Sequence, residues 1–148
     1  MRVLFGVESV FFSTSPLVSV LINHYNYGQF LDAAIASALN QTYPYTQVIV
    51  VDDGSTNCSR KIIASYGDRI ISVLKENGGQ ASAFNAGFAM SQGEIIIFLD
   101  SDDVLLPGIG QQVVEVFQQQ PEIVKVQYQL QVIDGEGHKA AVIEKKLC

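Results

Sequence analysis

The chain has 148 residues, of which 48% are apolar and 16% charged, a composition typical of one globular domain rather than a disordered segment. The net charge of −6 and the lack of a basic stripe argue against a nucleic-acid partner. Two isolated cysteines, Cys58 and Cys148, exclude a disulfide framework or a zinc site. No apolar run approaches the roughly 18–20 residues of a membrane-spanning helix. We therefore expect a cytoplasmic protein; peripheral attachment at the inner membrane face stays open, although nothing in the chain indicates membrane contact.

Residues 1–16 differ from the rest of the chain. They are apolar and carry Arg2, as a signal peptide does, but Glu8 interrupts the apolar stretch and no small-residue cleavage site follows. We therefore interpret them as a leader or a poorly ordered segment. Pro16 ends this segment, and residues 17–148 form the predicted domain.

Four short apolar runs predict strands buried on both faces, as in a parallel sheet covered by helices. Segments with apolar residues at helical spacing separate them. A further segment, residues 123–133, alternates apolar and polar residues and predicts a strand near the edge of the sheet. The repeated strand–helix order predicts an α/β domain with a mostly parallel sheet and helices on both faces. The predicted strands are 17–22, 47–51, 70–74 and 95–99, and the predicted helices are 29–40, 55–66, 81–91 and 107–120.

Carboxylates gather directly after two of these strands. Five of the eight aspartates lie in Asp52–Asp53 and Asp100–Asp103, and open α/β sheets bind their ligands at the carboxyl ends of strands. Three carboxylates within four residues repel one another, and a divalent cation removes that conflict. Mg²⁺ or Mn²⁺ takes one or two carboxylates, while phosphate oxygens and water complete its shell. A solvated acidic loop is the alternative, but we favour the metal.

Other residues near the carboxyl ends of the predicted strands, the rim of the sheet, indicate a ligand site less specifically. Tyr25 offers a flat face on which a nucleobase can stack, but it can equally pack under its own loop. Asp52 and Asp53 can accept hydrogen bonds from a base N–H or from ribose hydroxyls. We interpret His24 as an incidental loop residue, and Lys75 as a solvated lysine, although it is the cation nearest to this rim.

Five segments, in order, resemble the amino-terminal half of glycosyltransferase family 2. The match covers roughly residues 17–120 and includes Val-Asp-Asp-Gly-Ser-Thr at 51–56 and Leu-Asp-Ser-Asp-Asp at 99–103. The resemblance implies an inverting nucleotide-sugar transferase of the GT-A fold, with a divalent cation, Mg²⁺ or Mn²⁺, at an Asp-x-Asp motif. The matching segments are 18–26, 38–44, 48–56, 77–87 and 93–103.

The resemblance also implies roles for individual residues. Tyr25 would stack on the nucleobase and Asp53 would hydrogen-bond it, with Asn23 beside them. Because a carboxylate accepts the imide N–H of uracil, we expect a UDP-sugar donor, while guanine and thymine remain open. The acceptor would be a saccharide or another hydroxyl compound. Asp100 would lie near the ribose or the sugar, and Asp102 and Asp103 would hold the metal and the diphosphate.

The sequence departs from the family pattern in two places. Many members have an arginine where this chain has Phe84, which puts a cationic contact to the donor in doubt. The family's catalytic base lies well beyond the Asp-x-Asp motif, in the acceptor-binding half, and nothing after Asp103 resembles that second motif. Glu136 and Glu144 are acidic and late but lack the expected neighbours. We therefore expect a donor-binding half, with the acceptor-binding part absent and the base supplied outside this chain.

Two other classes of function compete with a transferase. A non-catalytic nucleotide-binding or regulatory module would explain the missing base. A phosphotransferase that uses Asp100 and Asp102 as nucleophile and acid would not explain the Asp52–Thr56 turn or the Tyr25 loop. The transferase is the reading that accounts for all three strand-end loops.

Overall fold

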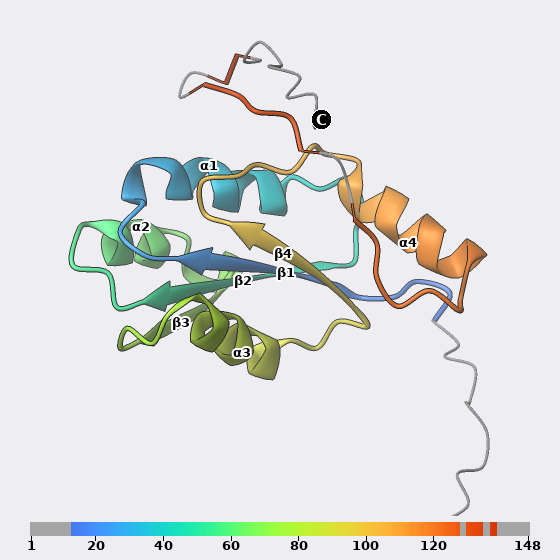
Figure 1. The fold of residues 1–148 in the computed structure, drawn as a ribbon, viewed down its shortest axis with the longest axis horizontal. Coiled ribbons are helices and arrows are strands. Elements are labelled where there is room, and N and C mark those ends of the chain that lie inside the picture. The colour runs from blue at the N-terminus through green and yellow to red at the C-terminus, as the bar shows by residue number, and fades with distance from the viewer. Residues whose placement is uncertain (1–12, 128–129, 135–136, 139–148) are drawn as a thin grey trace, which may run out of the picture.

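The computed structural model describes residues 13–127, 130–134 and 137–138. Within them four parallel strands form one sheet in the order β3-β2-β1-β4, and helices pack on it (Figure 1). The strands are β1 (Val18–His24), β2 (Thr46–Asp53), β3 (Ile71–Lys75) and β4 (Ile95–Asp100). The helices are α1 (Gly28–Leu39), α2 (Ser59–Ser65), α3 (Gln80–Met90) and α4 (Ile109–Gln119), with a short 3-10 helix, η1, at Gly67–Arg69.

Strand β1 lies inside the sheet, between β2 and β4, and supplies side chains to both faces. Val18, Val20 and Ile22 are fully buried in one apolar cluster, and Leu21 is buried in a second cluster on the opposite face. Successive side chains of a strand point to opposite faces, so a strand covered on both sides needs an unbroken apolar run. This explains the mainly apolar run of β1, in which the buried Ser19 donates to Gln47 Oε1 at 2.8 Å. The prediction of burial on both faces is wrong for β3 and β4, where Leu74 and Phe98 are about half exposed.

Helices cover both faces of the sheet, as predicted. Figure 1 shows α1 and α2 above the sheet and α3 below it. Leu31 and Ile35 of α1 join the larger cluster, together with Val113 of α4, and Ala83 of α3 joins the smaller one. The predicted α/β architecture is therefore confirmed. Helix α2 begins later than predicted, at Ser59, because the residues before it form a loop at the rim of the sheet.

One predicted strand is wrong. Residues 123–127 and 130–132 are not in a strand, and Ile133 forms only an isolated bridge; residues 128–129 lie outside the described residues. Val124 and Leu130 are 94% and 75% exposed. The segment and β4 instead line a common cavity of about 830 Å³. An alternating pattern indicates which residues would share a face of a strand. A strand forms only where the backbone of another strand is close enough to form hydrogen bonds with it.

Residues 13–16 pack against the domain. The backbone N–H and Oγ of Ser13 donate to the Glu94 carboxylate at 3.0 and 2.7 Å, and the Tyr43 hydroxyl donates to the Pro16 carbonyl at 2.7 Å. The boundary after residue 16 stays a prediction, because residues 1–12 lie outside the described part of the chain. No helix among the described residues is long and apolar enough to cross a bilayer.

Candidate functional site

The carboxyl ends of all four strands lie along the same end of the sheet, which is its rim. His24 at the end of β1 is in register with Asp52 of β2, and Asn23 is in register with Asp100 of β4. Asp53 is in turn in register with Lys75 at the end of β3. The parallel register therefore brings the predicted rim residues onto one edge, although they come from distant parts of the chain.

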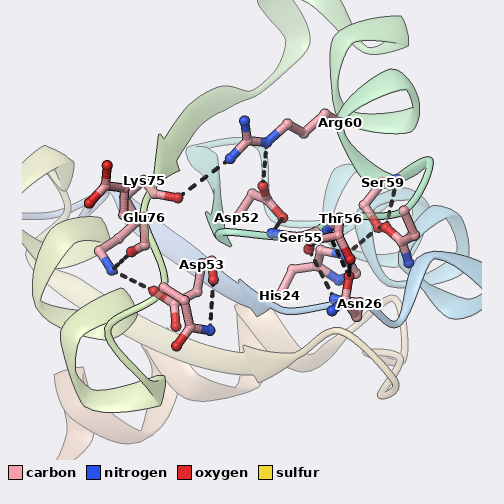
Figure 2. A network of polar contacts seen from close by, with 12 residues as sticks. His24, Asn26, Asp52, Asp53, Ser55, Thr56, Ser59, Arg60, Lys75 and Glu76 are labelled. Carbon is pink, nitrogen blue, oxygen red and sulfur yellow. Dashed lines mark hydrogen bonds and ion pairs between the residues drawn. The ribbon is translucent and has the colours of Figure 1, made fainter.

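Hydrogen bonds tie the loop after β1 to the loop after β2. The Asn26 side-chain oxygen accepts a bond from the Thr56 backbone N–H at 2.9 Å, and the Asn26 N–H donates to Ser55 Oγ at 2.9 Å (Figure 2). Asn26 has a φ of 58°, a left-handed conformation that asparagine tolerates. The neighbouring Tyr25 is 47% exposed, so its ring is available to a ligand at the rim.

The Asp53 carboxylate is buried and bound by three internal donors. Oδ1 accepts from Lys75 Nζ at 2.5 Å and from the Gly78 N–H at 3.0 Å, and Oδ2 accepts from the Gly79 N–H at 2.8 Å. Burial alone would raise the pKa of Asp53, but these hydrogen bonds and the Lys75 charge outweigh it and lower the pKa. The interpretation of Lys75 as a solvated lysine is wrong, since its side chain is only 22% exposed and pairs with Asp53. The register of β2 and β3 causes this pairing.

Asp52 faces away from this pair and anchors α2. Its Oδ2 accepts from Arg60 Nε at 2.8 Å, and its Oδ1 accepts from the Ser55 N–H at 3.3 Å. The turn between Asp52 and Ser55 depends on Gly54, which has a φ of 83°. A Cβ at this position would also lie 2.6 Å from the Asn77 backbone nitrogen. The two neighbouring carboxylates therefore bind different partners: Asp52 pairs with α2 and Asp53 with β3.

His24 is a buried strand residue and not a loop residue, which corrects the earlier interpretation. Its side chain is fully buried at the end of β1, and Nε2 lies 2.6 Å from Ser59 Oγ (Figure 2). Ser59 Oγ also contacts Asn57 Oδ1. Burial lowers the pKa of His24, and the nearby Asp52 charge offsets only part of that effect. The ring therefore links β1 to the start of α2 in its neutral form.

We expect the domain to lose stability as pH falls below 6.5, the ordinary pKa of histidine. The unfolded chain then binds a proton that folded His24 does not, so this contribution is complete above 6.5 and is lost below it. Thermal unfolding should give a lower midpoint at about pH 5.5 than at about pH 7.5. One proton per pH unit corresponds to about 1.4 kcal/mol, so the decrease should stay within about 3–6 °C. His24→Gln should flatten this dependence, and His138→Gln, at an exposed histidine, should not. A wild-type midpoint that is constant over this range would contradict the assignment.

The acidic turn after β4 holds the remaining predicted residues. Asp100 accepts a hydrogen bond from Gln80 Nε2 at 3.0 Å, and the Asp103 N–H donates to the Asp100 carbonyl at 3.0 Å. Asp102 is exposed on the same turn. Partial desolvation raises the pKa of the exposed Asp103, and the charges of Asp102 and Asp100 raise it further. Negative charge on this turn is therefore poorly compensated by the protein.

The donor set of this turn fits a hard divalent cation that phosphate oxygens help to bind. Asp102 and Asp103 are exposed carboxylates, and no ion pair to either occurs within the described residues. Carboxylate oxygens suit Mg²⁺ and Mn²⁺. In the described ranges no group of three or more His, Cys, Asp or Glu is arranged to hold an ion by itself. The two carboxylates therefore suit an ion that takes its other ligands from water and from a diphosphate.

Comparison with known proteins identifies the family. A model described as glycosyl transferase family 2 matches residues 19–142. The chain belongs to this family. An uncharacterized glycosyltransferase of Nostoc sp. is 45% identical over 122 residues, which are 80% of this chain and 38% of that protein. A putative teichuronic acid biosynthesis glycosyltransferase of Bacillus subtilis is 40% identical over 92 residues, 60% of this chain and 36% of that protein. This family 2 chain thus spans well under two thirds of these relatives.

Solved structures share the fold of this family 2 chain. S. aureus TarS 1-349 in complex with UDP-GlcNAc gives a TM-score of 0.63 at 25% identity, covering 70% of this chain and 31% of that one. A mannosyltransferase from Pyrobaculum calidifontis in complex with GDP-Man and Mn²⁺ gives a TM-score of 0.53 at 25% identity, covering 66% and 30%. The predicted resemblance is confirmed, and the fold is of the GT-A type, of which this chain covers a part.

Some residues of this glycosyltransferase chain were missed by sequence reasoning. Arg60 and Gln80 hold Asp52 and Asp100. Arg60 lies outside the segments that resemble the family, and Gln80 lies inside the segment 77–87 but had no role assigned to it. Phe84, which replaces the family's usual arginine, packs edge-to-face on Phe98 with ring centroids 4.9 Å apart, so this position serves apolar packing here. Glu136 and Glu144 lie outside the described residues.

Proposed function

We propose that this chain is the donor-binding part of a glycosyltransferase that moves a sugar, with inversion, from a UDP-sugar to an acceptor hydroxyl. The observation that carries the proposal is the meeting of three strand-end groups at one edge of the sheet: the Tyr25 loop, Asp53 and the Asp100–Asp103 turn. TarS shares the fold in complex with UDP-GlcNAc, which supports a uridine nucleotide. The mannosyltransferase complex with GDP-Man and Mn²⁺ supports a divalent cation.

Four residues would bind and orient the donor. The exposed ring of Tyr25 stacks on the base, and Asp53 accepts a base N–H, with Asn23 beside them at the end of β1. Asp100, held by Gln80, lies near the ribose or the sugar. Because Asn26 ties the loop of Tyr25 to the loop that follows Asp53, the two base contacts are held in a fixed relation.

Asp102 and Asp103 would hold Mg²⁺ or Mn²⁺, which supplies stabilisation of the negative charge that grows on the departing diphosphate. The base that deprotonates the acceptor, a saccharide or another hydroxyl compound, is supplied outside this chain in this proposal. The chain itself then binds and orients the donor, and it would not by itself transfer sugar to an acceptor.

Competition among uridine, guanosine and thymidine diphosphates in the presence of Mn²⁺ tests the base assignment. We expect the uridine and thymidine nucleotides to bind more tightly than the guanosine nucleotide, because Tyr25 and Asp53 together match a single ring with an imide N–H, which uracil and thymine share. Tighter binding of the guanosine nucleotide would refute the UDP assignment. Lack of binding by all three would refute the proposed function itself.

Tyr25→Ala should weaken UDP binding by about five- to tenfold, equivalent to about 1 kcal/mol of stacking. Tyr45→Ala is the matched control, because Tyr45 is similarly exposed, 52% against 47%, but precedes β2 at the opposite edge of the sheet. Isothermal titration of both variants with UDP and Mn²⁺ measures the difference. Equal affinities for the two variants would remove Tyr25 from the base site.

A further inference from the structure

We propose that Lys75 is a positioning residue that sets the nucleobase preference of this chain, because its ammonium group holds Asp53 as a carboxylate with one acceptor position left for the base. The inference rests on the proposed contact between Asp53 and the base. Lys75 itself would not touch the donor. Its effect would be to select a base that presents an N–H, such as uracil, over a base that presents a bare ring nitrogen, such as cytosine.

The contacts of Lys75 fix its side chain at two points. Nζ donates to Asp53 Oδ1 at 2.5 Å and to the Glu76 carbonyl at 2.6 Å (Figure 2). The Lys75 carbonyl lies 3.5 Å from Arg60 Nη2, so the strand end that carries Lys75 is also tied to α2. With 22% exposure, the lysine is an integral part of the rim and not a mobile surface charge.

Counting hydrogen bonds shows what Asp53 can still accept. An ionised carboxylate has about four acceptor positions. Oδ1 uses two, for Lys75 and the Gly78 N–H, and Oδ2 uses one, for the Gly79 N–H. One position on Oδ2 remains. A buried carboxylate with three internal donors and one free position matches a single N–H from a ligand.

The charged groups around Asp53 leave Lys75 as its counter-ion. On β2 the neighbouring Asp52 is paired with Arg60 of α2, so neither group compensates Asp53. Glu76 is exposed, and the first turn of α3, which follows Gly79, carries no acidic residue. Burial would raise the pKa of Asp53, whereas Lys75 and the two glycine N–H groups lower it below its ordinary 3.8. Without Lys75 the burial effect would be opposed only by the two N–H groups.

The protonation state of Asp53 determines which base fits. The carboxylate accepts the N3–H of uracil, whereas cytosine presents an unprotonated N3 that would face it lone pair to lone pair. A protonated Asp53 would reverse this preference, since its O–H can donate to N3 of cytosine. Two buried acceptors left facing each other weaken binding by about tenfold or more.

The test titrates UDP and CDP, each with Mn²⁺, into the chain at about pH 7 and about pH 5.5. The wild type should favour UDP by about tenfold or more at both values. Lys75→Met should lose UDP affinity and gain CDP affinity as pH falls, so that the ratio moves towards one, because the substitution removes two of the causes that lower the pKa of Asp53. Lys75→Arg should keep the wild-type ratio. Lys61→Met is the matched control, since Lys61 is an exposed lysine of α2.

Two additional variants distinguish failure of the proposed base contact from failure of the proposed role of Lys75. Asp53→Asn should reduce the preference for UDP at both pH values, because an amide can donate to cytosine. If it leaves the ratio unchanged, the proposed base contact fails. If Asp53→Asn changes the ratio and Lys75→Met keeps the wild-type ratio at both pH values, only the role of Lys75 is overturned. Circular dichroism checks folding, and Lys75→Gln, which is also neutral, replaces Lys75→Met if that variant does not fold.

Discussion

Replacing Asp102 and Asp103 together by asparagine should lower metal-promoted UDP binding by about 100-fold or more. Loss of an indirect contact to a metal ligand already costs about 10–100-fold, and this double change removes the proposed ligands themselves. The fold should persist, because both residues are exposed on the turn after β4 and contribute nothing to the apolar clusters. Isothermal titration with UDP and Mn²⁺ gives the affinity.

Stability should move in the opposite direction in the same variant. The charges of Asp102 and Asp100 oppose ionisation of Asp103, so neutral amides remove a repulsion that the folded chain contains. The unfolding midpoint should therefore stay unchanged or rise slightly. Asp68→Asn with Glu122→Gln is the matched control, since both residues are exposed acids away from this turn. Equal loss of UDP affinity in the control would show a general charge effect and contradict a specific site.

Gly93→Ala should destabilise the domain by about 3 kcal/mol or more, or prevent folding. A Cβ at position 93 would lie 2.6 Å from Ser19 Oγ and 2.7 Å from the Ser19 backbone nitrogen. Ser19 is fully buried inside β1, which pairs with strands on both sides, so its backbone cannot yield locally. Glycine at this position lets the chain enter β4 against β1.

Thermal or denaturant unfolding measures this cost, and about 2–4 °C is lost per kcal/mol in a domain of this size. Gly108→Ala is a suitable control, because its Cβ would meet nothing closer than Gln112 Nε2 at 3.6 Å. That change should cost at most about 1 kcal/mol, since Gly108 caps α4. If Gly93→Ala unfolds at the same midpoint as Gly108→Ala, the close approach of residue 93 to β1 is wrong.

The strands and the rim could be predicted because short apolar runs are visible in sequence, although burial on both faces holds for β1 and β2 and not for β4, where Phe98 is 50% exposed. Ile95–Leu99 has no polar break, and β4 extends it by one residue to Asp100. The carboxylates directly follow the strands. Because all the strands are parallel, these carboxylates lie at the same end of the sheet. For the same reason the family motifs placed Tyr25, Asp53 and Asp100 at one edge.

What could not be predicted depends on register and on contacts between distant segments. The pairing of Lys75 with Asp53 follows from the β2–β3 register, which joins two strands that are separate in the sequence. His24 continues β1 beyond the apolar run, and only the structure shows that Ser59 lies within reach of its ring. The strand predicted at residues 123–133 is wrong for the converse reason. Its alternation is clear, but β4 pairs with β1, and the described residues of this segment form no strand apart from an isolated bridge at Ile133.

The central claim is that the rim binds a nucleoside diphosphate and a divalent cation together, and calorimetry with UDP tests it most directly. The titration is run with Mn²⁺ and repeated with a chelator in place of the metal. Because the diphosphate would complete the shell of an ion held by Asp102 and Asp103, we expect affinity to fall by about 100-fold or more when the metal is removed, as in the double variant. Equal UDP affinity with and without the metal would contradict the claim.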